Sequence, residues 1–475
     1  MDTRWSISHQ IAFVISSITL ASSMFVTGCG TSTETAGANQ SSGAQTGTAG
    51  STIPAPPPIP PTPNPVVRTG PTYIVGVDYP NLESCVAGVA LDSTCLLQSG
   101  YAESPTTGIL INESHLTVAC QPGVYLTETS TAPVVTIAAN DVVIDGCTFN
   151  GASPVLEGSG LLVHYSSGIY IINDTFEGFS GPALRLSNTS GMLIAGNRFY
   201  SNSSDAIYGE VNLYNIDIVN NPMIDASRIT TWGHAIGLHS TEASANIENV
   251  NINSNYIING SSFCVEVGSF GGELPTDVTI QNNYCLQAAS AGNHGGYSLS
   301  GTNIAAVISN IYAINSAGYG HMAGVEAVSG FNATITNNML FGLDISIDRQ
   351  SGSKVSGNVV QDPVNGVGVA ISSSVTESSV KNNSINDNTI MFTRAIAAQK
   401  GIWLQCNALN AVCSSNSITN NRIDQVSAVS GTGILVEDDK GMMVDNQVES
   451  NSISGMKVCV NAGETATAIL NNKCN

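Results

Sequence analysis

Charged residues are scarce in this chain of 475 residues, and basic residues are the scarcest of them. Only 10% of the residues are charged, and 14 Lys and Arg against 35 Asp and Glu give a net charge of −21. Phosphate backbones are bound through clusters of Lys and Arg, so this balance argues against a nucleic acid as partner. It argues equally against electrostatic attachment to an anionic membrane.

Several catalytic signatures are also missing. The cysteines and histidines show no zinc-binding spacing, there is no phosphate-binding loop of the P-loop type, and no local motif indicates Ser–His–Asp chemistry. Apolar residues nevertheless make up 42% of the chain, which is enough for a large core and argues against disorder over most of its length.

Glycine, asparagine and β-branched residues are abundant, whereas helix-forming residues are few. The chain has 47 Gly and 46 Asn, together with many Val, Ile, Ser and Thr. β-Branched residues favour strands, and Gly and Asn favour tight turns. The composition therefore predicts an all-β fold of short strands joined by tight turns.

The segment 1–28 has the features of a signal peptide. Arg4 lies in a short polar start, and the apolar stretch from Ile11 to Val26, about 16 residues, is too short for a comfortable membrane span. The segment Val26-Thr-Gly-Cys29 resembles the lipobox of bacterial lipoproteins. The resemblance implies cleavage before Cys29, lipidation of Cys29, and anchoring to a lipid bilayer of the cell envelope, at the outer membrane or cell surface. The alternative is an ordinary secretory signal with a chance cysteine.

Residues 29–71 are expected to form a disordered tether between Cys29 and a folded domain, residues 72–475. Small and polar residues dominate the first half of the tether, and a proline-rich run from Pro54 to Pro65 forms much of the second. Such a segment is a flexible coil followed by a stiffer polyproline stretch. It would hold the folded domain away from a lipid surface.

The cysteines agree with export. Without Cys29, ten of the 11 cysteines remain, and an even number in an exported chain indicates disulfides. The ten form near-neighbour couples along the chain. We favour the pairs Cys85–Cys95, Cys120–Cys147 and Cys406–Cys413, with Cys264–Cys285 and Cys459–Cys474 as weaker pairs because Cys285 and Cys474 occupy core-like positions.

A degenerate repeat runs through most of the chain. The unit is apolar-x-Asn-x-apolar, often with the Asn doubled, as in Ala195–Phe199 and Thr419–Ile423. Its anchor positions are 147, 174, 197, 221, 255, 283, 310, 338, 358, 383 or 388, 421, 446 and 472, with a mean spacing near 27 residues. An Asn at a fixed place tolerates left-handed turn geometry, and its amide can bond the Asn of the next unit in a ladder.

Short alternating segments fill each repeat, such as Gly401–Gln405 and Gly433–Glu437. Stacked units of this length and pattern resemble the right-handed parallel β-helix, or pectin-lyase-like, superfamily over the whole of residues 72–475. The resemblance implies an all-β solenoid of about 12–14 coils, with an N-terminal cap formed by residues 78–100 over the open end.

One strand of each repeat presents alternate side chains to solvent. Aligning the inward apolar pairs, among them Leu343/Ile345, gives an outward column of Arg185, Tyr208, Gly237, Glu266, Ser298, Glu326, Asp344, Gly368, Trp403 and Leu435. A second column, two residues on, contains Glu210, His239, Ser300, Ser346, Gln405 and Glu437. A slip of the register would change both columns.

The centre of the first column is acidic and holds the candidate catalytic residues. Glu326 and Asp344 are predicted on adjacent coils, about 5 Å apart, and Glu266 and Glu326 two coils apart, about 10 Å. Paired carboxylates suit glycoside hydrolysis, with retention at the short spacing and inversion at the long one. Glu326 and Asp344 are also candidate ligands for a calcium cofactor. The alternative is that these carboxylates are solvated outer positions of a sheet.

Four further residues of the columns are candidates for sugar binding. Trp403 and Tyr208 can stack on sugar rings, and Arg185 and His239 can donate hydrogen bonds. His234, His239, His294 and His321 fall on neighbouring coils, which suits a proton-shuttling or metal cluster, or else histidines of turns and edges.

The resemblance implies relatives among polysaccharide lyases and glycoside hydrolases, but their motifs are mostly absent. Gly233-His-Ala and Gly320-His-Met differ from the Gly-His-Gly of polygalacturonases, and Asp438-Asp439 comes too late in the chain. Two functions therefore stay open. One is a cell-envelope lipoprotein that associates with a polysaccharide and acts on it as a lyase or hydrolase. The other is a non-enzymatic surface rod for adhesion or envelope structure.

Overall fold

The computed structural model describes residues 68–152, 158–224, 233–259, 262–273, 275–287, 295–300, 305–315, 323–394, 398–426, 430–463 and 467–475. The chain divides into two units, Met1–Ala55 and Pro56–Asn475, and every described residue belongs to the second. The predicted signal peptide, Cys29, most of the tether, His294 and His321 lie outside the described residues.

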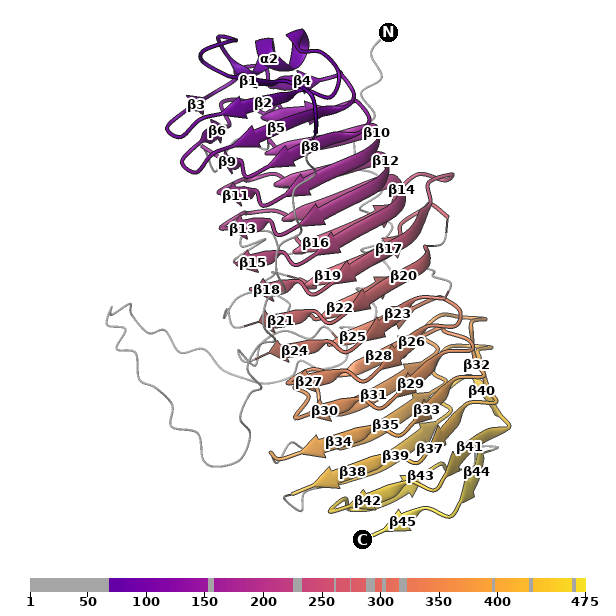
Figure 1. The fold of residues 1–475 in the computed structure, drawn as a ribbon. Helices are drawn as coiled ribbons and strands as arrows, with labels where there is room; N and C mark the ends of the chain where they lie inside the picture. Colours follow the sequence, from indigo (N-terminus) through magenta and orange to yellow (C-terminus); the bar gives the residue numbers. More distant parts are fainter. Residues whose placement is uncertain are drawn as a thin grey trace, which may run out of the picture. The chain divides into compact units, whose positions relative to one another are not determined.

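The described residues form stacked coils of parallel strands, as predicted (Figure 1). One sheet has 15 strands, one per coil, so the stack exceeds the predicted 12–14 coils. Its strands are β3 (Ala102–Glu103), β6 (Tyr125–Thr127), β9 (Thr148–Asn150), β11 (Thr175–Glu177), β13 (Arg198–Tyr200), β15 (Pro222–Ile224), β18 (Tyr256–Ile258), β21 (Tyr284–Gln287), β24 (Tyr312–Asn315), β27 (Met339–Phe341), β30 (Val359–Gln361), β34 (Thr389–Phe392), β38 (Arg422–Gln425), β42 (Ser452–Ser454) and β45 (Lys473–Cys474).

The other two sides of the coils form one continuous sheet of 27 strands, because three long strands run along both sides. These strands are β10 (Leu161–Ile172), β12 (Leu184–Ala195) and β14 (Ile207–Val219). The first side, which carries the predicted outward columns, contains in addition β4 (Ile109–Ile111), β7 (Val135–Ile137), β16 (Ile236–Ser240), β19 (Val265–Ser269), β22 (Tyr297–Ser300), β25 (Val325–Val328), β28 (Ile345–Asp348), β31 (Val367–Ser372), β35 (Gln399–Gln405), β39 (Gly431–Glu437) and β43 (Val458–Asn461).

The second side continues the stack in the same order. It contains β1 (Thr72–Ile74), β2 (Thr94–Leu97), β5 (Leu116–Cys120), β8 (Val142–Asp145), β17 (Ile247–Asn253), β20 (Thr276–Gln281), β23 (Val307–Ser309), β26 (Thr334–Thr336), β29 (Lys354–Ser356), β33 (Ser384–Asn386), β37 (Ser417–Thr419), β41 (Asn446–Glu449) and β44 (Thr467–Leu470). A small extra sheet joins β32 (Ser379–Lys381), β36 (Val412–Ser414) and β40 (Met442–Val444).

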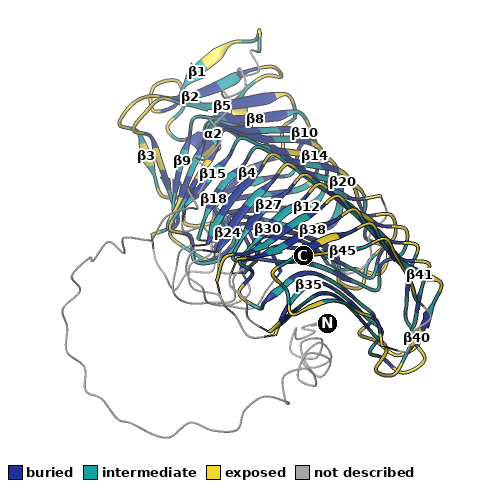
Figure 2. Cartoon of the chain, turned by 90° about the horizontal axis from the view of Figure 1, so that it is seen from below, coloured by how far each residue is buried: buried dark blue, intermediate teal, exposed yellow. Residues whose placement is uncertain are grey.

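The core lies inside the coils, where buried residues line every sheet (Figure 2). Alternation of inward apolar and outward polar residues produces this core, because successive side chains of a strand point to opposite faces. Identical residues stack from coil to coil: the rings of Phe149, Phe176 and Phe199 lie parallel with centroids 4.9 Å apart.

The N-terminal cap is confirmed as a short helix, α2 (Leu82–Gly88), within the predicted segment 78–100. Asn81 caps its N-terminus by accepting a hydrogen bond from the Ser84 N–H, and Leu82, Cys85 and Val86 are buried against the first coils. Among the described residues, no helix has the length and apolar character of a membrane span.

The sequence pattern assigns the left-handed turn and the hydrogen bond to the next coil to one Asn, but the two residues of each doublet perform one of these roles each. The first residue of the doublet adopts the left-handed conformation, with φ of 60° at Asn220 and 56° at Asn420. The second residue is buried, and its side-chain amide bonds the next coil. This ladder comprises Asp174, Asn197, Asn221, Asn255 and Asn283, and then Asn338, Asn358, Asn388, Asn421, Asn451 and Asn472.

The predicted anchor positions 310 and 446 are wrong, and both residues of the alternative 383 or 388 prove to be ladder residues. Asn310 is the left-handed residue of its turn, and the buried Ile311 takes the ladder position without an amide. Asn446 belongs instead to a second ladder, formed by Ser353, Asn383, Asn416 and Asn446. Asn383 and Asn388 are therefore both ladder residues, one in each ladder, and strand β33 (Ser384–Asn386) lies between them.

All five predicted disulfides are present, including the two pairs that the sequence favoured less. They are Cys85–Cys95, Cys120–Cys147, Cys264–Cys285, Cys406–Cys413 and Cys459–Cys474. Cys264 and Cys285 are both fully buried, so a core position does not prevent pairing when the two side chains point toward each other inside one coil.

The ladder predicts that a single buried amide carries measurable stability. Asn421 donates to the Ile385 carbonyl at 2.9 Å, and its side-chain oxygen accepts from the Asn388 N–H at 3.0 Å. We expect Asn421→Ala to lower the free energy of unfolding by roughly 2–5 kcal/mol, because it leaves buried polar groups unpaired. Denaturant unfolding measures this loss, and the substitution of the exposed Asn112 by Ala is the control. Equal losses in the two variants would contradict a contribution of the ladder to stability.

Candidate functional site

The outward column exists on the first side, with the predicted register over most of its length. Strand pairing places Arg185, Tyr208, Gly237, Glu266, Ser298 and Glu326 on successive coils, and Trp403 and Leu435 follow further on. Asp344 and Gly368 are wrong: Ser346 and Ala370 occupy those two places, so Ser346 leaves the second column. Leu343, Ile345 and Ile347 alternate, and the correct inward pair is Ile345/Ile347 rather than Leu343/Ile345.

Glu326 is a half-buried carboxyl group in the middle of the column. The Ser298 hydroxyl donates a hydrogen bond to its Oε1 atom at 2.6 Å. Burial raises the pKa of Glu326 to about 7, and the nearby charges of Glu266, Asp344 and Asp348 act in the same direction. A substantial fraction of Glu326 therefore carries a proton at neutral pH.

Asp344 lies near Glu326, but not directly opposite to it. It precedes β28, its backbone carbonyl accepts from the Gly324 N–H, and its carboxylate accepts from the Asn365 amide at 2.6 Å. The offset of two residues along the neighbouring coil makes the separation diagonal, roughly 8 Å between backbones instead of the predicted 5 Å. The backbones of Glu326 and Asp344 therefore do not have the short spacing that was expected for the carboxylate pair of a retaining hydrolase. Calcium binding by Glu326 and Asp344 stays a prediction.

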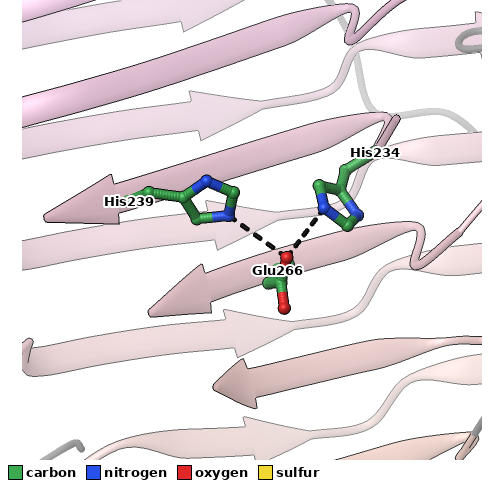
Figure 3. A group of neighbouring side chains, drawn as sticks. All are labelled: His234, His239 and Glu266. Atoms are coloured by element: carbon green, nitrogen blue, oxygen red, sulfur yellow. Dashed lines mark hydrogen bonds and ion pairs between the residues drawn. The ribbon is translucent and has the colours of Figure 1, made fainter. Parts of the chain in front are cut away.

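Two coils before Glu326, a second cluster brings together Glu266 and two histidines (Figure 3). Glu266 comes from β19, His239 from β16 on the preceding coil, and His234 from the turn that leads into β16. The Oε2 atom of Glu266 lies 2.7 Å from Nε2 of His234 and 3.2 Å from Nε2 of His239. All three side chains are mostly buried, with exposed fractions of 11%, 9% and 13% for Glu266, His234 and His239.

The charges of this cluster support one another. Burial alone would raise the pKa of Glu266, but hydrogen bonds and positive charge from the two histidines outweigh it and hold the pKa well below its usual range. Burial alone would lower the pKa of His234, but Glu266 and Asp205 outweigh it and raise the pKa. Asp205, itself buried, accepts a hydrogen bond from the His234 N–H at 2.6 Å. The cluster is thus a buried carboxylate neutralised by imidazoles.

The sequence placed Glu266 and His239 on the same face and grouped His234 with His239 in a proton-shuttling or metal cluster, but it did not connect Glu266 with these histidines. His239 was expected to bind sugar and Glu266 to act as a catalytic carboxylate, and the structure pairs them with each other. His234 stands outside the repeating strand pattern, so no periodicity predicts its direction. The one available signal was the short spacing of His234 and His239 around Gly237.

The candidate sugar-binding residues have partners of their own within the protein. Arg185 forms an ion pair with Glu210 of the next coil, and the Tyr208 ring meets the His239 ring edge-on at 5.8 Å. Burial raises the pKa of Tyr208 to about 12, with the charges of Glu210 and Asp205 contributing. Tyr208 is therefore a proton donor or a hydrogen-bonding group at neutral pH and not a phenolate.

Trp403 lies three coil steps beyond Glu326, roughly 14 Å along the column. Its Nε1–H donates to Glu437 at 3.0 Å, and the Lys400 ammonium lies 3.2 Å from the ring centroid. This cation–π contact places the Lys400 ammonium over one face of the indole.

Comparison with known proteins supports the fold. Residues 102–285 match the family described as the right-handed beta helix region. This match and the stacked parallel strands confirm the resemblance to right-handed parallel β-helix proteins. No curated protein sequence matches the chain.

Among solved structures, the similarity is distant. The Dettilon tailspike protein is 15% identical with a TM-score of 0.42, covering 73% of this chain and 64% of its own. An α-1,3-glucanase catalytic unit from Streptomyces thermodiastaticus is 12% identical with a TM-score of 0.37, covering 77% and 64% respectively. The surface adhesin PfbA of Streptococcus pneumoniae is 13% identical with a TM-score of 0.36, covering 78% and 83%. An adhesin and an enzyme appear at the same level of similarity, so we derive no activity from these matches.

The raised pKa of Glu326 predicts a pH-dependent loss of stability. The folded protein holds this proton up to a pH of about 7, whereas the unfolded chain releases it near 4.5, so the contribution of Glu326 to stability falls between these values as the pH rises. As the pH rises from 4.5 to 8, we expect the free energy of unfolding of Glu326→Gln to increase by up to about 3 kcal/mol relative to that of the parent protein. Denaturant unfolding at both pH values measures the gain. The exposed Glu248→Gln should show no such change, and a Glu326→Gln gain that is independent of pH would contradict the raised pKa.

Proposed function

We propose that the first side of the coils, from β10 to β43, binds a polysaccharide and hydrolyses it with Glu326 as general acid. The proposal rests on Glu326, a half-buried carboxyl whose pKa of about 7 lets it donate a proton at neutral pH. A leaving glycosidic oxygen needs such a donor, and a carboxyl with an ordinary pKa would already be ionised. Positioned proton transfer of this kind contributes roughly 10²–10⁴ to a rate.

Asp344 is the partner that we assign as general base. It lies on the coil after Glu326, and its charge acts on Glu326. Glu266, the other nearby carboxylate, is already bound by two histidines and is the poorer base. The backbones of Glu326 and Asp344 lie roughly 8 Å apart on the diagonal, and we propose that their carboxyl groups hold a water molecule between them, as in hydrolases that invert the anomeric centre.

A neutral polysaccharide fits the charge of this protein best. A net charge of −21 would repel a polyuronate. The indole of Trp403 and the polar groups of the column offer stacking and hydrogen bonds instead, which is how uncharged sugars are held.

The assay is hydrolysis of a panel of neutral and acidic polysaccharides by the full-length protein. We expect new reducing ends from a neutral substrate and no growth of unsaturated-uronate absorbance. We also expect inversion at the anomeric carbon, which NMR detects. Glu326→Gln and Asp344→Asn should lower kcat by about 10²-fold or more. Glu248→Gln, on the adjacent side of the coils, should leave it unchanged.

Three results would overturn the assignment. Growth of unsaturated-uronate absorbance would identify a lyase and direct attention to the few Lys and Arg residues. Undiminished hydrolysis by Glu326→Gln would remove Glu326 from the mechanism. Absence of both cleavage and binding across the panel would favour the non-enzymatic surface rod.

We further propose that the protein is a lipoprotein of the cell envelope, anchored through Cys29. The lipobox-like Val26-Thr-Gly-Cys29 supports this, and the five disulfides support an oxidising compartment outside the cytoplasm.

Mass spectrometry of the N-terminal peptide from the protein made in a bacterium tests the anchor. We expect an acylated Cys29 at the new N-terminus and partition of the protein into a detergent phase. Cys29→Ala should move it to the aqueous phase, whereas Thr31→Ala should not. An unmodified Cys29 in the mature protein would refute the anchor.

A further inference from the structure

Three potential metal-ligating atoms converge on the first side of the coils, two coil steps before Glu326. They are Nε2 of His234, Nε2 of His239 and Oε2 of Glu266, and all lie within 4.8 Å of one another. We propose that these three residues bind one divalent transition-metal ion of the zinc class. Metal binding needs no sugar, so the inference goes beyond the proposed hydrolysis and stands or falls independently of it.

Glycine at position 237 makes the convergence feasible. Gly237 occupies the column between Tyr208 and Glu266, directly below the two imidazoles. A Cβ atom there would lie 3.1 Å from Cδ2 of His234 and 3.5 Å from Cε1 of His239. Any side chain beyond Cβ would extend into the space between the rings and Glu266, whereas glycine leaves it open.

The distances require only a small adjustment. Zinc bonds of about 2.0–2.1 Å to nitrogen and oxygen place tetrahedral ligand atoms about 3.3 Å apart. The two Glu266 contacts, 2.7 Å and 3.2 Å, are already near this value. The two histidine nitrogens have to approach each other by less than about 1.5 Å, which rotation about the side-chain torsions supplies.

The ligand set selects the class of ion. Two imidazole nitrogens and one carboxylate oxygen suit zinc and its first-row neighbours, and three protein ligands leave a further position for water or another ligand. Calcium prefers six to eight oxygen ligands, which this cluster does not offer. The site is thus distinct in chemistry from the calcium site expected at Glu326 and Asp344.

The surroundings hold the ligands in place and limit water. Asp205 fixes the backbone of His234 through its 2.6 Å hydrogen bond. Aromatic rings enclose the imidazoles: Phe263 lies against His234 at 6.4 Å, and Phe270 meets His239 edge-on at 4.7 Å. Outer contacts of this kind orient metal ligands and lower the local dielectric constant, which strengthens binding.

Titration of the full-length protein tests the site. The purified protein is treated with a chelator, dialysed, and titrated with Zn²⁺ in a calorimeter and with Co²⁺ in a spectrophotometer, without any polysaccharide. We expect one equivalent bound per chain, a visible Co²⁺ spectrum of four- or five-coordinate nitrogen and oxygen ligation, and displacement of Co²⁺ by Zn²⁺ but not by Ca²⁺.

Single-residue variants locate the bound ion. His239→Gln and Glu266→Gln should each weaken Zn²⁺ binding by about 100-fold or more, since loss of an outer partner of a ligand already costs up to roughly 100-fold. His164→Gln is the matched control, since His164 lies in the same column as His239, three coil steps away, and should bind Zn²⁺ like the parent protein.

Circular dichroism of each variant shows whether it folds, and the Co²⁺ spectrum of the parent protein does not depend on any variant. Absence of an equivalent of Zn²⁺ in the parent protein would overturn the site. So would undiminished binding by folded His239→Gln or Glu266→Gln, or a Co²⁺ spectrum of six oxygen ligands. Because no substrate is present, each outcome is separate from the fate of the proposed hydrolysis.

Discussion

The hydrogen bond from one buried asparagine amide to the next coil is the interaction on which this structure depends. A buried amide without a partner costs free energy, so each Asn requires the coil beside it to present its own Asn at the same height. That requirement fixes the stacking of the turns, and the strands that follow inherit their register from it. The outward columns, and with them Glu326 and the His234–His239–Glu266 cluster, are consequences of this alignment.

Much of the fold was accessible from the sequence because the repeat is local and recurs many times. Asn spacing and strand alternation indicated the β-helix, the resemblance to that superfamily implied the cap, and the near-neighbour cysteine couples gave the disulfide pairs. The errors arose where the pattern offers two equivalent solutions. Three alternating apolar residues, Leu343, Ile345 and Ile347, permit two registers, and only the three-dimensional stacking selects one. A turn with a single Asn does not show whether that residue turns the chain or bonds the next coil: Asn310 turns the chain, and Ile311 takes the ladder position.

The candidate site was harder to predict than the fold, for a related reason. Periodicity places the side chains of strands, and so it brought Glu266, Ser298 and Glu326 together correctly. It carries no information on the direction of the His234 side chain, because His234 lies in a turn, or on how closely the two imidazoles approach Gly237. Nor does a sequence reveal how strongly burial acts on a carboxyl. Glu266 and Glu326 are two outward glutamates of one column, yet the first is held as an anion by histidines and the second retains its proton.

Ile311 interrupts the first asparagine ladder between Asn283 and Asn338. In a stack whose coils contact only their neighbours, stability is a sum of terms for single units and for the junctions between them. The junction between the coils of Asn283 and Ile311 retains its backbone hydrogen bonds and its core but lacks the side-chain amide bond, whereas the Ile311 N–H still donates to Oδ1 of Asn338 on the next coil. Neighbouring coils are therefore stabilised by one another to unequal extents, and a weaker junction near the middle of the stack separates two blocks of stronger cooperativity. The Cys264–Cys285 disulfide closes a coil immediately before that weaker junction, so the block that carries the histidine cluster ends in a covalently cross-linked coil.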